Sequence, residues 1–291
     1  MKRVTVLVTG RTGQLGQELA VLAPSNATID WVFTDRSQLD LTDFSQLPEK
    51  LTALAPDYII NCAAYTAVDK AETESALADT INHKAVGVLA QWCAVNQCKF
   101  LHVSTDYVFD GTSNRPLSEA APSFPINTYG KTKLAGELAC LIANPDAIIV
   151  RTSWVYSAYG ANFVKTMLRL MGEKETVSIV NDQIGSPTYA ADLAEVLVAF
   201  IHHENWLPGI YHYSNEGEIS WFQFAQAIQA ITGSSCKLIG IPTVDYPTPA
   251  QRPNYSLLDK SKIKKVLGIT ISDYQTSLEK CIELIQANST T

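Results

Sequence analysis

The fold is decided by residues 4–16, which read VTVLVTGRTGQLG. The first six are β-branched or apolar without interruption, which predicts a strand buried on both faces, as in a parallel sheet. Gly10, Gly13 and Gly16 follow at three-residue spacing, and a helical pattern covers 17–22. A glycine loop between a strand and a helix brings backbone N–H groups and the positive end of the helix dipole close to a pyrophosphate. The segment therefore predicts a dinucleotide-binding site.

A second strand over 29–34 ends at Asp35, about 20 residues past the loop, where such sites bind the adenosine ribose. Asp35 favours a 2′-hydroxyl and Arg36 favours a 2′-phosphate, so the choice between NADH and NADPH stays open. Asp40 and Leu41 fall where the next loop approaches the adenine. A polar turn without a ligand is the alternative.

Strand and helix patterns alternate through the first half of the chain. Further strands are expected over 58–64, 100–105 and 147–150, and helices over 47–54, 73–95 and 129–143. This alternation predicts an α/β fold of the Rossmann type, a doubly wound parallel sheet with a smaller α/β substrate-binding lobe. Residues 1–154 are expected to form the dinucleotide-binding domain and 155–291 mainly the substrate lobe, with helix 190–203 returning to the first domain.

Three polar side chains point to carbonyl chemistry. Tyr129 and Lys133 are four residues apart, so they share one face of a helix. A phenol beside an ammonium group loses its proton more easily than its reference pKa of about 10 suggests. Thr105 ends a strand, where open parallel sheets hold their ligands. The alternative is an exposed lysine and a half-buried tyrosine on an ordinary helix. Asn82 is either a satisfied core amide or the holder of a proton-relay water.

Composition bounds the class of protein. The formal net charge of the 291 residues is −7 with interspersed charges, which argues against a nucleic-acid partner. No apolar run reaches the roughly 18 residues of a membrane span, and Lys2 and Arg3 lead into a strand rather than a signal peptide. The six cysteines lack metal-type spacing, which favours free thiols in a reducing compartment. A cytoplasmic protein is expected.

Six stretches carry a resemblance to known enzymes: residues 9–16, 63–72, 104–111, 129–137, 151–156 and 181–188. The chain resembles the extended short-chain dehydrogenase/reductase superfamily and, within it, the dTDP-4-dehydrorhamnose reductase family. The glycine loop and the Tyr-x-x-x-Lys pattern identify only the superfamily. The stretches 151–156 (RTSWVY) and 181–183 (NDQ) narrow the match much further.

The resemblance implies hydride transfer from NADPH or NADH to the C4 carbonyl of a dTDP-sugar, dTDP-4-dehydro-L-rhamnose, which gives dTDP-L-rhamnose. The catalytic set would be Thr105, Tyr129 and Lys133. The coenzyme would contact Tyr129, Lys133, Gly10, Thr12, Gly13, Gln14, Leu15, Gly16, Asp35, Arg36, Asp40, Leu41, Ala63, Ala64, Tyr65 and Thr66. The substrate would contact Val68, Thr105, Asp106, Tyr107, Trp154 and Arg252.

Several alternatives stay open within this resemblance. Trp154 is either a wall for the sugar ring or a core aromatic, and Arg252 is a candidate for the phosphates. Another nucleotide-sugar reductase or an epimerase would share Tyr129 and Lys133. A non-catalytic regulatory subunit would be favoured by loss of either residue, and both are present.

The acidic residues that would bind a metal at a dimer interface are only partly present in this sequence. Some relatives are thought to dimerise through acidic side chains that bind Mg²⁺. Glu18 matches one such position, but Ala190 and Ala191 stand where a further carboxylate is expected, and Asp192 lies elsewhere on the helix. No metal site is predicted, and a homodimer is allowed without support for the metal-bridged form.

Overall fold

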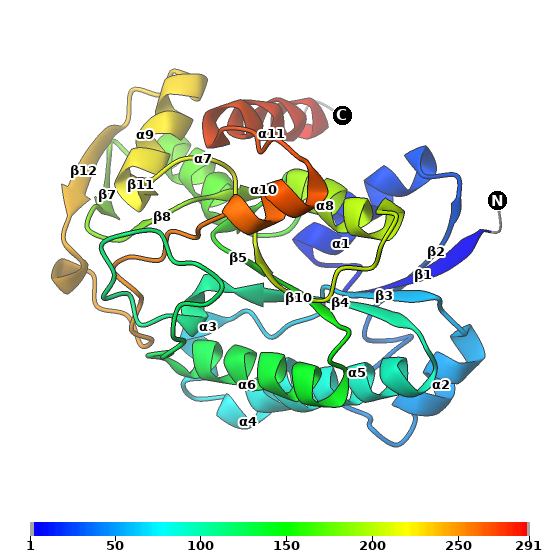
Figure 1. The fold of residues 1–291 in the computed structure, drawn as a ribbon. Coiled ribbons are helices and arrows are strands. Elements are labelled where there is room, and N and C mark those ends of the chain that lie inside the picture. Colours follow the sequence, from blue (N-terminus) through cyan, green and yellow to red (C-terminus); the bar gives the residue numbers. More distant parts are fainter. Residues whose placement is uncertain (1–2, 290–291) are drawn as a thin grey trace.

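A six-stranded parallel sheet forms the centre of the protein (Figure 1). The structure is a computed structural model, and it describes residues 3–289. All neighbouring strands of this sheet pair in parallel. The strand order is β10 (Gly209–His212), β5 (Ile148–Thr152), β4 (Lys99–Thr105), β3 (Tyr58–Asn61), β1 (Val4–Thr9) and β2 (Ile29–Thr34). The predicted Rossmann-type α/β class is confirmed.

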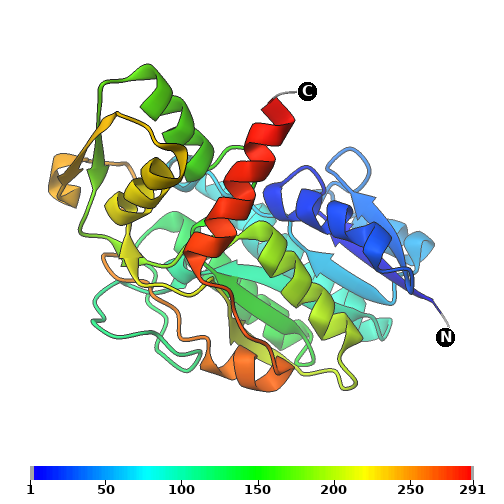
Figure 2. The ribbon, with the colours of Figure 1, turned by 90° about the horizontal axis from the view of Figure 1, so that it is seen from above.

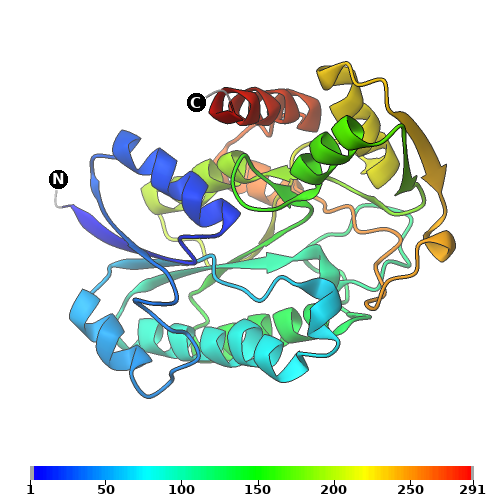
Figure 3. The ribbon, with the colours of Figure 1, turned by 180° about the vertical axis from the view of Figure 1, so that it is seen from behind.

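Helices cover both faces of the sheet (Figures 1 and 3). One face is covered by α1 (Gln14–Leu22) and α8 (Ala190–His202), and the other by α2 (Leu47–Leu54), α5 (Ala85–Val95) and α6 (Thr128–Ala143). Alternate residues of β1 enter the two cores: Val6 packs with α1 and α8, and Leu7 packs with α2 and α5. A strand buried on both sides has no polar face, which explains the unbroken apolar run in the sequence.

A smaller lobe stands beside one end of the sheet (Figure 2). The hydrophobic core of this lobe includes the side chains of Tyr156, Phe224 and Leu278. The lobe contains α7 (Phe163–Glu173), α9 (Trp221–Thr232), α11 (Tyr274–Ser289) and three two-stranded sheets: β7 (Thr176–Val180) with β12 (Lys237–Ile241), β6 (Val155–Tyr156) with β9 (Thr188–Tyr189), and β8 (Ile184–Gly185) with β11 (Ile219–Ser220).

Two elements beyond residue 154 belong to the large sheet in addition to α8. Strand β10 forms its edge, and α10 (Ser261–Leu267) contributes Ile263 to the core of that side. The chain therefore crosses between sheet and lobe several times. Among residues 3–289, no helix has the length and apolar character needed to cross a membrane.

The helix expected over 73–95 is continuous from Ser75 to Val95 but contains one π-helical turn that the sequence did not predict. It consists of α4 (Ser75–Asp79), the π-helical turn (Thr80–Lys84) and α5 (Ala85–Val95). Tertiary contacts hold this turn in place. The Asn82 side chain accepts from the Tyr65 N–H and donates to the Tyr65 carbonyl, and the Asn82 carbonyl lies so close to α6 that a Cβ on Gly136 would come within 2.0 Å of it. Asn82 is thus a satisfied core amide.

A buried ion pair ties α6 to the sheet. The Arg151 Nε lies 2.9 Å from Oε1 of Glu137, and the Arg151 Nη2 lies 2.6 Å from Oε2. The Ser104 hydroxyl donates to the same carboxylate, and the Arg151 guanidinium lies over the ring of Phe109. Both charged side chains are almost fully buried. The pair therefore fixes α6 on β4 and β5, and α6 carries two of the predicted catalytic residues.

Replacing Glu137→Gln should destabilise the fold by about 3–5 kcal/mol, because it leaves the Arg151 charge buried without its partner. Chemical denaturation measures this loss. The exposed pair Arg169–Glu173 on α7 offers a matched control, and Glu173→Gln should cost at most about 1 kcal/mol. Equal effects of the two changes would contradict the assigned role of the buried pair.

Candidate active site

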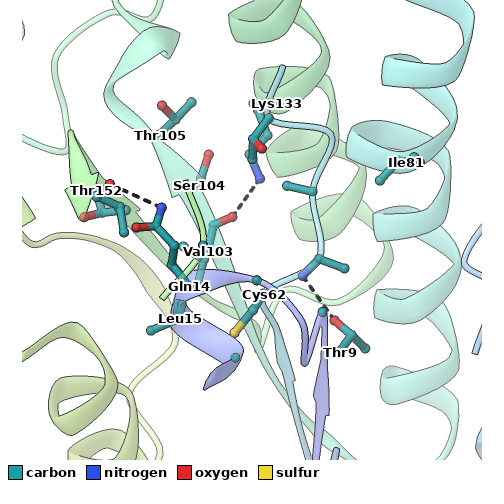
Figure 4. Close-up of a pocket in the computed structure, with 18 of the residues that line it drawn as sticks. Thr9, Gln14, Leu15, Cys62, Ile81, Val103, Ser104, Thr105, Lys133 and Thr152 are labelled. Carbon is teal, nitrogen blue, oxygen red and sulfur yellow. Dashed lines mark hydrogen bonds between the residues drawn. The ribbon is translucent and has the colours of Figure 1, made fainter. Parts of the chain in front are cut away.

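A cavity of about 670 Å³ opens at the carboxyl ends of the strands. Thr9 ends β1, Thr105 ends β4 and Thr152 ends β5, and all three line the cavity. Open parallel sheets bind ligands at this edge, outside the carboxyl ends of their strands. The sheet thus gathers into one space residues that are far apart in the sequence (Figure 4).

The glycine loop forms one wall and leaves no room for side chains. Gly10 has φ +75°, and a Cβ there would lie 2.8 Å from the Ala63 nitrogen. A Cβ on Gly16 would lie 2.3 Å from the Gly10 carbonyl oxygen. Gly13 precedes α1 without a side-chain cap, so the first turn of the helix is available to an anion. Helix α1 starts at Gln14, three residues earlier than expected. This cradle fits the pyrophosphate of a dinucleotide.

The smaller lobe contacts one residue of this wall, Gln14. The Gln14 amide, labelled in Figure 4, donates to the Val155 carbonyl at 3.4 Å. It also accepts from the Asn162 amide at 2.9 Å. Gly160, at φ +64°, passes close to the Gln14 side chain, and Ala161 lines the cavity beside it. The smaller lobe therefore closes the cavity over the start of α1.

The far end of the cavity carries the residues predicted for the adenosine. The Asp35 carboxylate accepts from the N–H and the hydroxyl of Ser37, and these bonds lower the pKa of Asp35. The Arg36 Nε lies 3.4 Å from a carboxylate oxygen of Asp40. Asp35, Arg36, Asp40 and Leu41 all line the cavity. An ionised carboxylate and a guanidinium stand side by side here, so both coenzymes have a matching group.

Thr105, Tyr129 and Lys133 line the same cavity and are buried. The Thr105 hydroxyl donates to Asp106 at 3.1 Å and accepts from the Tyr107 N–H. Burial raises the pKa of Tyr129 to about 12. The Tyr129 phenol is consequently fully protonated at neutral pH, as a proton donor must be.

The Lys133 side chain lines the cavity and directs its ammonium group toward β4. Its Nζ donates to the Val103 carbonyl at 2.7 Å (Figure 4). The same nitrogen lies 3.3 Å from Nε2 of His102. Burial lowers the pKa of Lys133 to about 8, against the opposing charge of Glu137. The net lowering of the Tyr129 pKa that its spacing from Lys133 suggested is not found, because burial is the largest influence on the phenol and raises its pKa, while the Lys133 ammonium group faces Val103 and His102.

The predicted substrate side of the cavity contains a buried carboxyl and an aromatic stack. Burial raises the pKa of Asp106 to about 6, and its Oδ2 has no hydrogen-bond partner among the described residues. Trp154 adopts φ +47° and stacks on Trp221 with 3.7 Å between ring centroids. Gly185 makes this possible, since a Cβ there would lie 2.9 Å from the Trp154 ring. Trp154 is thus fixed at the cavity wall.

Two predicted residues lie outside the cavity lining. The Tyr65 phenol donates to Glu74, and Arg252 forms a bidentate pair with Asp69 at 2.8 and 3.1 Å. The other predicted residues line the cavity, including Thr12, Leu15, Ala63, Ala64, Thr66, Val68 and Tyr107.

The structure adds lining residues that the sequence did not suggest. Some could have been found from the rule that strand ends line such sites; Gly160, Ala161 and Leu193 arrive through long-range packing. The additions are Thr9, Leu39, Thr42, Cys62, Ile81, Val103, Ser104, Thr152, Ser153, Val155, Gly160, Ala161 and Leu193.

The acidic residues considered for a metal have protein partners. Glu18 accepts from the Ser157 hydroxyl, and Asp192 accepts from Asn215 and Ser277. Between residues 3 and 289, no three His, Cys, Asp or Glu side chains are arranged to hold a metal ion.

Replacing Gly16→Ala should abolish coenzyme binding, because the new Cβ would force the Gly10 carbonyl and the loop apart. Fluorescence titration with NADPH and NADH measures the affinity. Gly172→Ala is the control: Gly172 lies in α7 with open space around its Cβ position, so the affinity should stay unchanged. Coenzyme binding to the Gly16→Ala protein with unaltered affinity would refute the role assigned to the loop.

Comparisons with known proteins agree with this geometry. Residues 4–287 match the family described as the RmlD substrate binding domain. A dTDP-4-dehydrorhamnose reductase of Aggregatibacter actinomycetemcomitans is 42% identical over 94% of this chain and 97% of its own length. Solved structures of dTDP-4-dehydrorhamnose reductases from Clostridium acetobutylicum and from Bacillus anthracis, the latter in complex with NADP, have TM-scores of 0.92 at 37% and 38% identity, each covering 97% of this chain and 99% of its own. The chain therefore belongs to the RmlD substrate binding domain family, that of the dTDP-4-dehydrorhamnose reductases.

Proposed function

We propose that this protein reduces the C4 carbonyl of dTDP-4-dehydro-L-rhamnose to the alcohol of dTDP-L-rhamnose, with NADPH or NADH as reductant. The observation that carries the proposal is the convergence of Thr105, Tyr129 and Lys133 on the cavity that also contains the glycine loop. The complex of the Bacillus anthracis relative with NADP supports the coenzyme class.

The chemistry requires a hydride for C4 and a proton for its oxygen. A reduced nicotinamide supplies the hydride when it is bound. Tyr129 donates the proton, and its raised pKa keeps the phenol protonated at neutral pH. The Thr105 hydroxyl, which donates to Asp106 in this structure, rotates to donate to the C4 oxygen as negative charge develops there. Lys133, one helical turn from Tyr129, provides the positive charge that stabilises the phenolate left behind.

The remaining residues hold the sugar nucleotide. The buried Oδ2 of Asp106 is suited to accept a hydrogen bond from a sugar hydroxyl, since an unpaired buried oxygen is costly. Trp154 and Val68 form apolar walls of the cavity. We assign Arg252 to the phosphates, because Asp69 anchors its guanidinium next to Val68.

We also propose that the enzyme works in the cytoplasm, where the six free cysteines would stay reduced. A homodimer stays a prediction from the family resemblance.

Replacing Tyr129→Phe should lower turnover by about 10²- to 10⁴-fold, because it removes the proton donor. Coenzyme affinity should stay nearly unchanged. The assay follows NADPH or NADH absorbance with dTDP-4-dehydro-L-rhamnose and identifies the product by NMR. Tyr65→Phe is the matched control, since that phenol lies outside the cavity lining.

Unchanged turnover in the Tyr129→Phe protein would remove Tyr129 from the mechanism. A product with the opposite configuration at C4 would move the assignment to another nucleotide-sugar reductase of the superfamily.

Turnover should fall as the pH rises through about 8, the value to which burial lowers the pKa of Lys133. The reason is that the ammonium form, which stabilises the phenolate, is lost above that pKa. The pH dependence of kcat at saturating substrate measures the effect, and Lys133→Met should remove this limb together with most activity. A kcat that stays constant through this range would show that the charge on Lys133 is not required.

A further inference from the structure

Three neighbouring strands each contribute one buried polar side chain to a continuous row. The sheet register places Thr9 of β1 opposite Asn61 of β3, and Asn61 opposite His102 of β4. The Thr9 hydroxyl lies 2.6 Å from Oδ1 of Asn61, and the Asn61 Nδ2 lies 3.0 Å from Nδ1 of His102. We call Thr9, Asn61 and His102 the polar row. It ends at Lys133, whose Nζ lies 3.3 Å from the other ring nitrogen of His102.

The polar row places three polar side chains at buried positions that are usually apolar. Its three side chains are at most 2% exposed, and the residues beside them on the strands are apolar. Burying polar groups is unfavourable unless every donor and acceptor is matched, and a matched chain fixes a single arrangement. The row is matched from Thr9 to His102, so the direction of each hydrogen bond can be worked out.

The hydrogen bond between Thr9 and Asn61 sets the donor-to-acceptor direction of the whole polar row. The Ala63 N–H donates to the Thr9 oxygen (Figure 4), and the Thr9 hydroxyl is therefore free to donate its own proton. Its acceptor is Oδ1 of Asn61. The Asn61 Nδ2 then faces His102 and donates to Nδ1. Reversing the chain would leave the Thr9 proton facing the amide N–H groups of Asn61. Burial lowers the pKa of His102 well below its usual value, so the ring is neutral and carries its one proton on Nε2.

This proton points at Lys133. When Lys133 is an ammonium ion, two N–H donors face each other across 3.3 Å; when it is an amine, its lone pair accepts the bond from Nε2. The Val103 carbonyl accepts from Nζ in both states. The orientation of the polar row therefore favours release of the lysine proton.

We propose that His102 is a positioning residue for Lys133, and that the polar row fixes its ring with the proton on Nε2 and so tunes the proton affinity of the catalytic lysine. The catalytic meaning of this device rests on the proposed reductase function. A lysine that titrates near the working pH exchanges protons within a turnover, which a lysine with the reference pKa of about 10.4 does far less readily.

Other groups also shift the pKa of Lys133, some upward and some downward. Glu137 and Cys140 on α6 and Cys62 after β3 favour the ammonium form, whereas burial disfavours it. Arg151 on β5 faces Glu137 and partly cancels its charge. Tyr129 lies one turn away on α6. Because these groups are unchanged when the polar row is altered, they do not confound a test on the row.

The first test is the tautomer of His102 in the unaltered protein, read by long-range ¹⁵N–¹H NMR of the histidine rings. The His102→Gln protein assigns the resonance. We expect a neutral ring with its proton on Nε2 from neutral pH down through the range in which an exposed histidine becomes charged. A proton on Nδ1, or a charged ring at neutral pH, would overturn the proposal without any variant having to fold.

The second test reverses the row with Asn61→Asp, which keeps the shape of the side chain. A carboxylate accepts from Nδ1–H of His102, so the ring proton should move to Nδ1 and Nε2 should accept from the ammonium group. The pKa of Lys133 should then rise by about one unit, a tenfold gain in proton affinity. The ¹³Cε titration of Lys133, assigned with Lys133→Met, measures it.

Thr9→Ser is the matched control, since it keeps the hydroxyl and should move neither resonance. A pKa that rises while the ring proton stays on Nε2 would assign the rise to the new charge alone and would overturn the proposal. So would an unchanged pKa.

The link to catalysis has its own readout. In the reductase assay, the alkaline limb of the kcat profile should move upward in the Asn61→Asp protein by the same amount as the pKa of Lys133. The two NMR measurements need no turnover. If the unaltered protein fails to reduce the proposed substrate, the NMR outcomes still decide the role of His102.

Discussion

The parallel register of β1, β3, β4 and β5 is the constraint on which the rest of the structure depends. It aligns the carboxyl ends of four strands, so that the last residues of β1, β4 and β5 and the residue after β3 line one cavity. The same register aligns Thr9, Asn61 and His102 in one row, of which Thr9 also lines the cavity. Shifting one strand by a single residue would turn its side chains to the opposite face. Cavity and polar row would then be lost together.

The sequence was most informative where chemistry is local. The spacing of Gly10, Gly13 and Gly16 requires close backbone contacts, and the structure contains those contacts. Residues at strand ends, such as Thr105, can be placed from the position of the strands alone. The apolar run of β1 predicted burial on both faces, because a strand with no polar side has no surface to offer water.

The sequence was least informative where distant segments meet. Nothing in the pattern of 73–95 indicates that the helix carries a π-helical turn, because the cause lies in Tyr65 and Gly136. The pairing of Arg252 with Asp69 joins segments more than 180 residues apart. The pKa of Tyr129 depends on burial, which spacing along a helix does not reveal. Each of these features depends on a contact made only in the folded chain.

The π-helical turn at Thr80–Lys84 has a consequence for the phase of the helices around it. Such a turn holds one more residue than an α-helical turn, so the residues of α5 are rotated by about 100° relative to their places in an unbroken helix. Asn82 can therefore face Tyr65 while Leu89, seven residues later, still enters the core below the sheet. The extra residue allows one continuous segment to satisfy two geometries, that of the cavity and that of the core.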